Sequence, residues 1–110
     1  MKRLKIWLDD VRPEPSNRYL PFKKAEGLLS FIEEVLEGDL SKVEVFDLDH
    51  DLGDGMNGYE FIKAIISRVL DGRIVHADSP RWVIHSSNPV GAKNMEAAIR
   101  ELVSLSKEEV

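Results

Sequence analysis

Three short apolar runs that each stop at polar side chains constrain the fold of this chain more than any other feature of its sequence. They cover residues 4–8, 43–48 and 82–84. Runs of this length and near-continuous apolarity are typical of strands that are buried on both faces of a parallel sheet. The residues that follow the runs are Asp9-Asp10, Asp49 and His85-Ser86. The sequence therefore predicts a parallel sheet with polar chemistry at its carboxyl edge.

Apolar residues elsewhere recur every three or four positions, which is the spacing of a helix that buries one face. These stripes cover residues 28–36, 61–70 and 95–103. Asn57 is a possible N-cap of the second helix. Residues 18–24 could add a short strand at the edge of the sheet, because Pro21 lacks the N–H group that an interior strand needs.

This alternation predicts an α/β fold in three layers, with a mainly parallel sheet of about four strands flanked by helices and joined by right-handed crossovers. A chain of 110 residues has the size of one domain, which we expect to span residues 1–110 with a polar tail from about residue 106. Both tryptophans are assigned to the core. In sheets of this kind ligands bind outside the carboxyl ends of the strands.

The charge balance narrows the classes of partner. Fifteen Lys and Arg against twenty Asp and Glu give a net charge of −5, which disfavours broad adhesion to a DNA duplex, a long RNA track or an anionic membrane. The absence of Cys excludes disulfides, thiolate metal ligands and a cysteine nucleophile. The first apolar run is too short for a signal peptide, and no run approaches the roughly 20 residues that span a bilayer. We therefore expect a cytoplasmic protein.

Aspartate is unevenly distributed, because six of the nine Asp residues lie in two short stretches. Asp9 and Asp10 follow the first predicted strand and Asp49 follows its neighbour, so we expect their carboxylates to converge. Several carboxylates without Cys suit a hard cation, most simply Mg²⁺, and Asp51 is a fourth candidate ligand. The alternative is that Asp9 or Asp10 only caps a turn.

A calcium-binding EF-hand loop is a further alternative, because acidic residues alternate from Asp47 onward. No helix is predicted before Asp47, and the roughly 12-residue loop counted from it ends at Gly58, where a bidentate Glu is needed. Counted from Asp49, the loop ends at Glu60, but Asp54 stands where the loop requires Gly. Calcium is therefore disfavoured.

Two of the three histidines, His50 and His85, follow predicted strands beside the carboxylates. Imidazole titrates near neutral pH, so both are candidates for general acid and base chemistry. A histidine in such a place is otherwise structural, which is the interpretation we prefer for His76 in a polar loop. Asp47 lies inside its strand, which fits a structural carboxylate bonded to the backbone at least as well as a metal ligand.

The segment 86–94 links the last strand to the last helix and has the chemistry of an anion-binding turn. It offers the hydroxyls of Ser86 and Ser87, the amide of Asn88, the ammonium of Lys93 and the N–H groups of a helix N-terminus. Such turns are common, so the signal gains weight only opposite the acidic residues. Arg12 could bring a second cation to a phosphate, although a surface ion pair is the ordinary role of such a residue.

This layout resembles the receiver domain of bacterial response regulators. Paired acids follow the first strand, Asp49 takes the place of the phosphate acceptor after the central strand, and Ser86 takes that of the hydroxyl residue after a later strand. Three departures matter. The usual first helix is missing, the chain ends where a fifth strand would begin, and the phosphate-binding Lys of that strand has no counterpart except, loosely, Lys93.

A narrower resemblance covers nearly the whole chain. Residues 8–13, 49–53 and 85–91, followed by Asn94-Met95, are similar to the signatures of the cyclic-phosphate processing receiver domains. This resemblance implies a reduced receiver-like fold and an activity on the cyclic phosphates of nucleotides or RNA termini.

These residues indicate a metal-dependent phosphoesterase, and the family resemblance implies that its substrates are cyclic phosphodiesters. The aspartates hold the cation, the two histidines are candidates for base and acid, and the turn after the last strand holds phosphate oxygens. Asp49 is either a metal ligand or itself the nucleophile, as its receiver counterpart is. The sequence does not choose between these roles.

Two rival hypotheses are carried forward. The first is a non-catalytic, degenerate receiver that is phosphorylated on Asp49 or binds a phosphorylated ligand, although the missing Lys and the missing last strand count against phosphotransfer. The second is self-association, because the edge left by the absent fifth strand could pair with another chain and form a homodimer.

Overall fold

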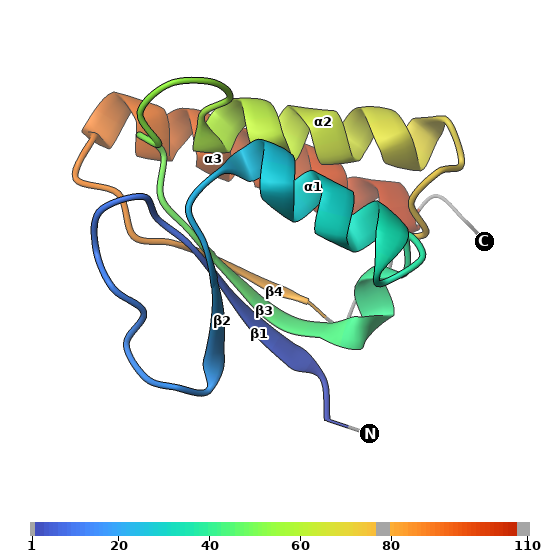
Figure 1. The fold of residues 1–110 in the computed structure, drawn as a ribbon. Helices are drawn as coiled ribbons and strands as arrows, with labels where there is room; N and C mark the ends of the chain where they lie inside the picture. Colours follow the sequence, from blue (N-terminus) through green and yellow to red (C-terminus); the bar gives the residue numbers. More distant parts are fainter. Residues whose placement is uncertain (1, 77–79, 108–110) are drawn as a thin grey trace.

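The structure is a computed structural model that describes residues 2–76 and 80–107. Its elements follow one another as β1 (Leu4–Leu8), β2 (Tyr19–Phe22), α1 (Ala25–Glu34), the 3₁₀ turn η1 (Leu40–Lys42), β3 (Val43–Leu48), α2 (Gly58–Leu70), β4 (Arg81–Ile84) and α3 (Pro89–Lys107) (Figure 1). Each strand and helix predicted from the sequence is present, including the short strand around Pro21.

The strands form one parallel sheet in the order β2-β1-β3-β4. This is the strand order of receiver-like and flavodoxin-like α/β folds, so the predicted fold class is confirmed. β1 and β3 are central, and β2 and β4 are the edges. Because β4 is an edge strand, its residues are exposed or half-buried, and the expectation that it is buried on both faces is wrong.

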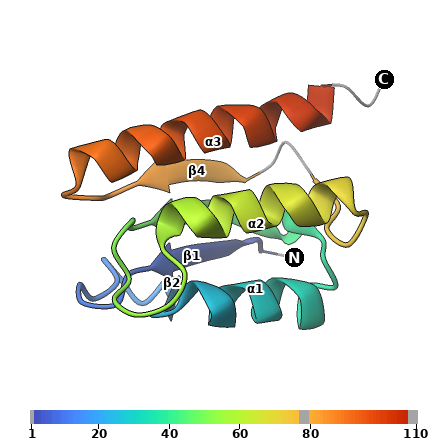
Figure 2. The same ribbon diagram turned by 90° about the horizontal axis from the view of Figure 1, so that it is seen from above.

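All three helices lie side by side on one face of the sheet (Figures 1 and 2). The regular structure therefore forms two layers, whereas the sequence suggested three. The strand order explains this, because the steps from β2 to β3 and from β3 to β4 run in the same direction along the sheet. Right-handed crossovers in one direction place their helices on the same face.

The connection from β1 to β2, residues 9–18, steps in the opposite direction and contains no helix. It passes on the side of the sheet away from the helices (Figure 1). Trp7 supports it there, because its indole Nε1 donates to the carbonyl oxygen of Arg12 at 3.0 Å. Trp7 is buried as expected, but on this second face and outside the main core, whereas Trp82 stacks on Phe46 in the core.

The main core lies between the sheet and the helices. Side chains alternate along a strand, so every second residue of β1 and β3 faces the helices. The helical stripes supply the opposite wall, which confirms their predicted role. Fully buried members include Ile6, Leu8, Leu28, Ile32, Phe46, Leu48, Phe61, Ile65, Met95 and Leu102.

The helix boundaries follow the predicted capping chemistry at α2 and differ at the end of α3. The Asn57 side chain accepts from the backbone N–H of Glu60, and the Glu60 side chain accepts from that of Asn57. Helix α3 continues to Lys107, so it includes the first two residues of the polar tail predicted from about residue 106. The rest of that predicted tail, residues 108–110, lies outside the described residues.

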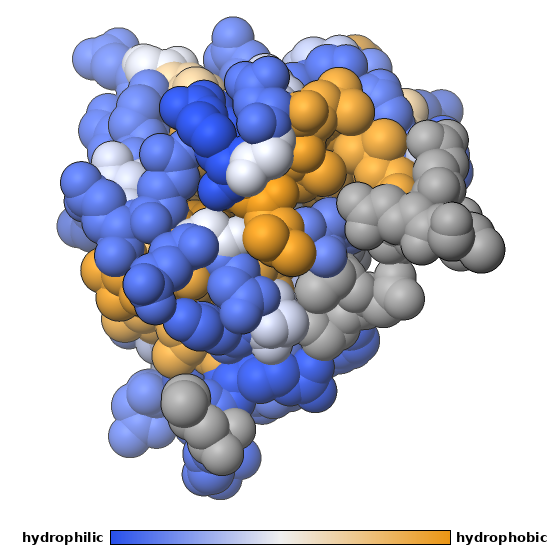
Figure 3. Space-filling model, turned by 90° about the vertical axis from the view of Figure 1, so that its right-hand side faces the viewer, coloured by the Kyte–Doolittle hydropathy of each residue, from blue (hydrophilic) through white to orange (hydrophobic). Residues whose placement is uncertain are grey.

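The end of the molecule where the strands begin carries exposed apolar side chains (Figure 3). Val35, which follows α1, and Leu70, which ends α2, are 60% and 70% exposed. Within residues 2–76 and 80–107, no helix is long and apolar enough to cross a membrane.

Candidate functional site

Three polar residues lie in a row immediately beyond β1, β3 and β4. The sheet continues for one more step there, because Asp9 N–H donates to Phe22, Asp49 N–H to Leu8 and His85 N–H to Leu48 at 2.9–3.0 Å. Leu8 and Leu48 face the helices, so the next residue of each strand points to the opposite face. Asp9, Asp49 and His85 therefore meet on the open side of the carboxyl edge, where a ligand site was predicted.

Asp9, Asp10 and Asp49, here called the acidic triad, come together as the sequence predicted. Each offers one carboxylate oxygen, and these oxygens all lie within 4.8 Å of one another. Asp9 and Asp49 are buried and Asp10 is half-buried, with its carboxylate beside Gly53. Three close carboxylates of this kind suit a hard divalent cation.

The Asp9 carboxylate is held firmly in its ionised form. Burial would raise its pKa, but the backbone N–H groups of Arg12 and Val11 and the ring of His85 outweigh that effect, and its pKa is lowered. Both N–H groups donate to Oδ1 at 2.8 Å. The turn-capping role considered for Asp9 is therefore real, and it leaves Oδ2 facing the site.

The pKa of Asp49 is shifted in the opposite direction. Burial and the neighbouring negative charge of Asp9 raise its pKa, although the backbone N–H of His50 donates to its Oδ1 at 2.8 Å and partly offsets both effects. The positive charge of Arg12 acts in the same stabilising direction. The site thus contains one carboxylate that is ionised readily and one that resists ionisation unless a cation is near.

His85 bridges two carboxylates and is locked in place. Its Nε2 lies 3.0 Å from Asp9 Oδ2, and its Nδ1 lies 2.6 Å from Asp47 Oδ1. Its ring stacks on Trp7 with centroids 3.9 Å apart and planes 2° from parallel. With both nitrogens and one ring face engaged, His85 fixes the orientation of Asp9.

Asp47 and Trp7 are the members of this arrangement that the sequence did not identify. Asp47 was weighed as a carboxylate bonded to the backbone or as a ligand, but it binds the imidazole of His85. Trp7 and Asp47 are register partners in β1 and β3, two positions before Asp9 and Asp49. The period of two along a strand, together with the pairing of β1 and β3, is the signal that places them on the same face.

Removing the carboxylate of Asp47 should loosen His85 and, through it, Asp9. We expect Asp47→Ala to weaken the binding of Mg²⁺ or Mn²⁺ by about 10- to 100-fold, because the groups behind a metal ligand commonly contribute that much. Isothermal titration calorimetry measures the change. Asp47→Asn keeps a hydrogen-bond acceptor, so its metal affinity should lie between those of the unaltered protein and Asp47→Ala. Asp71→Ala, at the exposed end of α2, is the control. Unchanged affinity in Asp47→Ala would contradict this role of His85.

His50 and Asp51 lie on the α3 side of the site. The ring of His50 packs against Gly91, where an added Cβ would lie 2.5 Å from the ring. His50 Nδ1 is 2.9 Å from Asp51 Oδ1. The Asp51 pKa is lowered by His50 and, less strongly, by a side-chain hydrogen bond with Asn88. Among the described residues, Asp51 does not belong to the carboxylates that reach one common point.

Two polar side chains of the turn before α3 bond to the backbone near the start of the helix. The backbone N–H of Asn88 donates to Ser86 Oγ, and the Asn88 side chain accepts from the N–H of Gly91, both at 3.0 Å. Ser87 and Lys93 are exposed. The structure therefore gives Ser86 and Asn88 a capping role, and their part in binding phosphate stays a prediction, as do those of Ser87 and Lys93.

Arg12 is oriented toward the site by a long-range contact. Its Nη1 donates to the carbonyl oxygen of His85 at 2.8 Å, and its charge lowers the pKa of Asp49. Arg12 was expected to form an ordinary surface ion pair, but it donates to a backbone carbonyl oxygen instead. A cation is thereby held beside the acidic triad by the loop 9–18.

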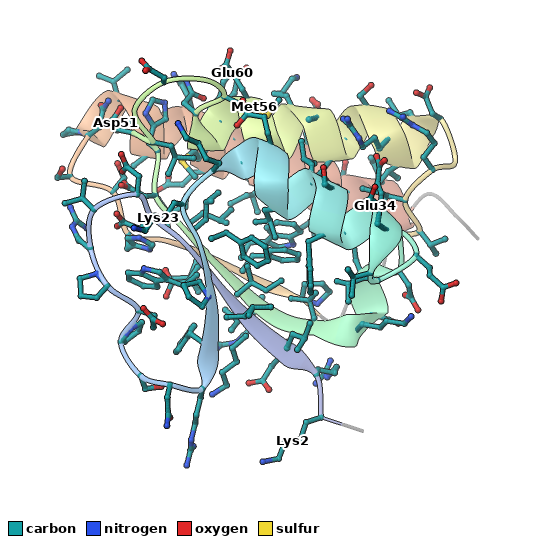
Figure 4. All side chains as sticks on the ribbon, viewed as in Figure 1. Lys2, Lys23, Glu34, Asp51, Met56 and Glu60 are labelled. Atoms are coloured by element: carbon teal, nitrogen blue, oxygen red, sulfur yellow. The ribbon has the colours of Figure 1, made fainter. Side chains whose placement is uncertain are left out.

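Residues at the start of α1 hold the loop between β3 and α2, and no sequence pattern indicates these contacts. Glu26, in the first turn of α1, accepts from the backbone N–H of Met56 at 2.7 Å, and Lys24 Nζ donates to the carbonyl oxygen of Asp54 at 3.0 Å. Figure 4 shows Asp51 and Met56 on this loop at the carboxyl end of the sheet. These contacts join residues about thirty positions apart and depend on the packing of α1 beside α2.

Comparison with known protein families identifies a family for nearly the whole chain. The family model of the cyclic-phosphate processing receiver domain matches residues 4–101, which includes all four strands and the acidic triad. Searches of curated proteins and of solved structures gave no match. The four-stranded parallel sheet, the acidic edge and the extent of the family match together show that the chain belongs to the family of cyclic-phosphate processing receiver domains.

Proposed function

We propose that this protein is a divalent-metal-dependent phosphoesterase that opens the cyclic phosphates of nucleotides or RNA termini. The observation that carries the proposal is the convergence of three carboxylate oxygens within 4.8 Å, with a guanidinium beside them, in a member of this family. A phosphate has to meet positive charge, and this edge is otherwise acidic. A bound cation and Arg12 together would supply that charge.

The acidic triad fits Mg²⁺ by its donor chemistry. All three donors are carboxylates, and Asp49 carries a raised pKa because it is buried next to Asp9. A cation between the two would remove that mutual repulsion. Mg²⁺ bound there would neutralise a non-bridging phosphate oxygen and polarise a water molecule.

The reaction requires one bond to form and one to break. In a 2′,3′-cyclic phosphate, phosphorus is bonded to two ribose oxygens. The oxygen of water attacks phosphorus, one of the two ring P–O bonds breaks, and the product is a phosphomonoester with a free ribose hydroxyl. The attacking water loses a proton and the released ribose oxygen gains one, so the site needs a base and an acid.

Four residues of the site have proposed roles in this step. His85 and His50 move the two protons, Arg12 holds a phosphate oxygen in place of the receiver lysine, and Asp49 is either a ligand of the cation or the nucleophile. The contact of His85 with Asp9 supports its position at the triad. If Asp49 attacks, its oxygen displaces the ribose oxygen to form an acyl phosphate, which water then hydrolyses.

The test is a product assay with purified protein. We expect a 2′,3′-cyclic nucleotide or an RNA with a cyclic-phosphate end to be converted into a phosphomonoester in Mg²⁺, and the conversion to stop in EDTA. Chromatography separates substrate from product. Failure of both substrates in Mg²⁺, Mn²⁺ and Ca²⁺ would contradict the proposed function.

The degenerate receiver is the competing hypothesis, because Asp49 stands in the acceptor position. Treatment with a small-molecule phosphodonor, followed by intact mass measurement, distinguishes the two. A stable adduct that Asp49→Asn abolishes, without turnover of any cyclic phosphate, would favour the switch.

A homodimer through β4 is a further proposal. β4 is an edge of the sheet, and within the described part of the chain no strand pairs with its outer side. Unpaired N–H and carbonyl groups of an edge can pair with a second copy. We expect multi-angle light scattering to give twice the mass of 12.5 kDa. A monomer of the unaltered protein at high concentration would reject this contact.

A further inference from the structure

A second cationic feature lies on the face of the sheet that the helices leave open. Lys2, Arg3, Lys5 and Arg18 line a groove of about 470 Å³, and Glu44 is the one acidic residue of its lining. The register places Lys5 on this face, because it alternates with Ile6, which faces the helices. Figure 4 shows Lys2 beyond the start of β1, on the side away from the helices.

The clustering of charge in the groove is opposite to the charge of the whole protein. The chain has a net charge of −5 and fifteen Lys and Arg residues in all, yet four of the five residues of this lining are cations. Lys5 Nζ is 3.9 Å from a Glu44 oxygen, which neutralises one of the four. The remaining cations form a local positive surface that attracts a polyanion.

One aromatic ring, that of Tyr19, lies beside Lys5 of the groove. Tyr19 is half-buried, Lys5 Nζ lies 5.8 Å from its ring centroid, and its ring meets Trp7 edge-on at 6.1 Å. Cations combined with an aromatic ring on an open sheet are suited to single-stranded nucleic acid, where the cations meet phosphates and a ring meets a base.

The groove and the acidic triad lie on the same face of the sheet, at the amino and carboxyl ends of β1. Arg12 stands at the triad and Arg18 in the groove, near the two ends of the loop 9–18 that crosses this side of the sheet. Along β1, Lys5 and Asp9 are separated by about 13 Å at the usual rise of a strand.

We propose that the groove binds the sugar–phosphate backbone of a single-stranded RNA whose 3′ end, closed as a 2′,3′-cyclic phosphate, lies at the acidic triad. This inference rests on the proposed function and names its substrate as an oligonucleotide. A mononucleotide would leave the groove empty. The groove is short, so it is consistent with the composition, which excludes a long basic track but not contacts to a few nucleotides near a terminus.

The test compares binding of two labelled probes by fluorescence anisotropy in Mg²⁺. The probes are a single-stranded RNA of about eight nucleotides with a 3′-phosphate, which the reaction cannot consume, and the corresponding nucleoside 3′-phosphate. We expect the RNA to bind at least about tenfold more tightly, and Lys5→Gln with Arg18→Gln to remove about tenfold of its affinity. The slope of log affinity against log salt should fall by about 1.4, since each cation contributes about 0.7 for a single strand.

Two controls distinguish the loss of charge in the groove from a general loss of charge and from misfolding. Arg73→Gln with Arg100→Gln removes two exposed cations elsewhere and should leave RNA binding within about twofold. Turnover of a 2′,3′-cyclic mononucleotide should be unchanged in the Lys5/Arg18 variant, which also shows that the variant is folded.

The outcomes distinguish this inference from the proposed function. Equal affinity for RNA and nucleoside phosphate, or an equal loss of RNA affinity in both double variants, would reject the groove as an RNA-binding site. If cyclic mononucleotides are still turned over, the proposed function stands. RNA binding that depends on Lys5 and Arg18 without any turnover would retain the groove and reject the function. Groove-dependent binding of polyglutamate in place of RNA would also overturn the assignment.

Discussion

The protein with Asp9→Asn and Asp10→Asn should lose turnover of cyclic phosphate by about a thousandfold or more, because Mg²⁺ contributes several kcal/mol of charge stabilisation to such reactions. These residues supply two of the three carboxylates that converge within 4.8 Å. Asparagine keeps the size of each side chain but removes the charge that holds a cation. Turnover is measured on a 2′,3′-cyclic nucleotide at saturating Mg²⁺.

Thermal unfolding provides a readout of the same variant that does not depend on activity. At a Mg²⁺ concentration about 100 times its Kd, the unaltered protein should gain about 2.7 kcal/mol, which corresponds to roughly 10 °C or more in Tm for a domain of this size. The double variant should show no such gain. Asp39→Asn, which is remote from the triad at the start of η1, serves as the control for a change in charge. A variant that is still folded, still stabilised by Mg²⁺ and still active would reject the acidic triad as the metal site.

Asp49→Asn is expected to abolish turnover and at the same time to stabilise the metal-free protein by about 1 kcal/mol at neutral pH. Burial and the charge of Asp9 raise the pKa of Asp49 in the folded state above its ordinary value of 3.8. Its contribution to stability is therefore present below pH 3.8 and lost as the pH rises through the raised pKa. At neutral pH the ionised carboxylate destabilises the fold, and asparagine removes that cost.

Asp9→Asn should change the free energy of unfolding in the opposite direction, and it serves as the matched comparison. The pKa of Asp9 is lowered, with the donated N–H groups and His85 outweighing burial, so its ionised form stabilises the fold above its ordinary pKa and that stability is lost as the pH falls through the lowered value. Asp9→Asn should therefore destabilise the protein by about 1–2 kcal/mol. Urea unfolding at neutral pH measures both variants. Equal shifts of the same sign would contradict the described electrostatics of the pair.

The sequence predicted the sheet because its strands are short, apolar and sharply bounded. Leu4–Leu8 and Val43–Leu48 were recognisable from composition alone, and Asn57 marked the start of α2. The number of layers could not be obtained in the same way. It follows from the direction of each crossover, which depends on strand order, and strand order is a property of long-range pairing that a single apolar run does not encode.

Some residues of the candidate site could likewise be predicted from the sequence, and others could not. Asp9, Asp10 and Asp49 could be predicted to converge, because carboxyl ends of parallel strands share one edge. Asp47 could not be assigned to His85, since that contact requires the register between β3 and β4. Asn88 illustrates the reverse, because a residue with the chemistry of an anion site is occupied in capping α3.

We propose that the acidic triad holds a divalent cation that the opening of a cyclic phosphate requires. The most direct test titrates Mg²⁺ into the metal-free protein and measures two quantities on the same sample, bound Mg²⁺ by calorimetry and the rate of conversion of a 2′,3′-cyclic nucleotide. We expect bound Mg²⁺ and the rate to rise with the same midpoint, and both to vanish in the protein with Asp9→Asn and Asp10→Asn. A rate that is undiminished in EDTA, or a bound ion whose occupancy leaves the rate at zero, would contradict it.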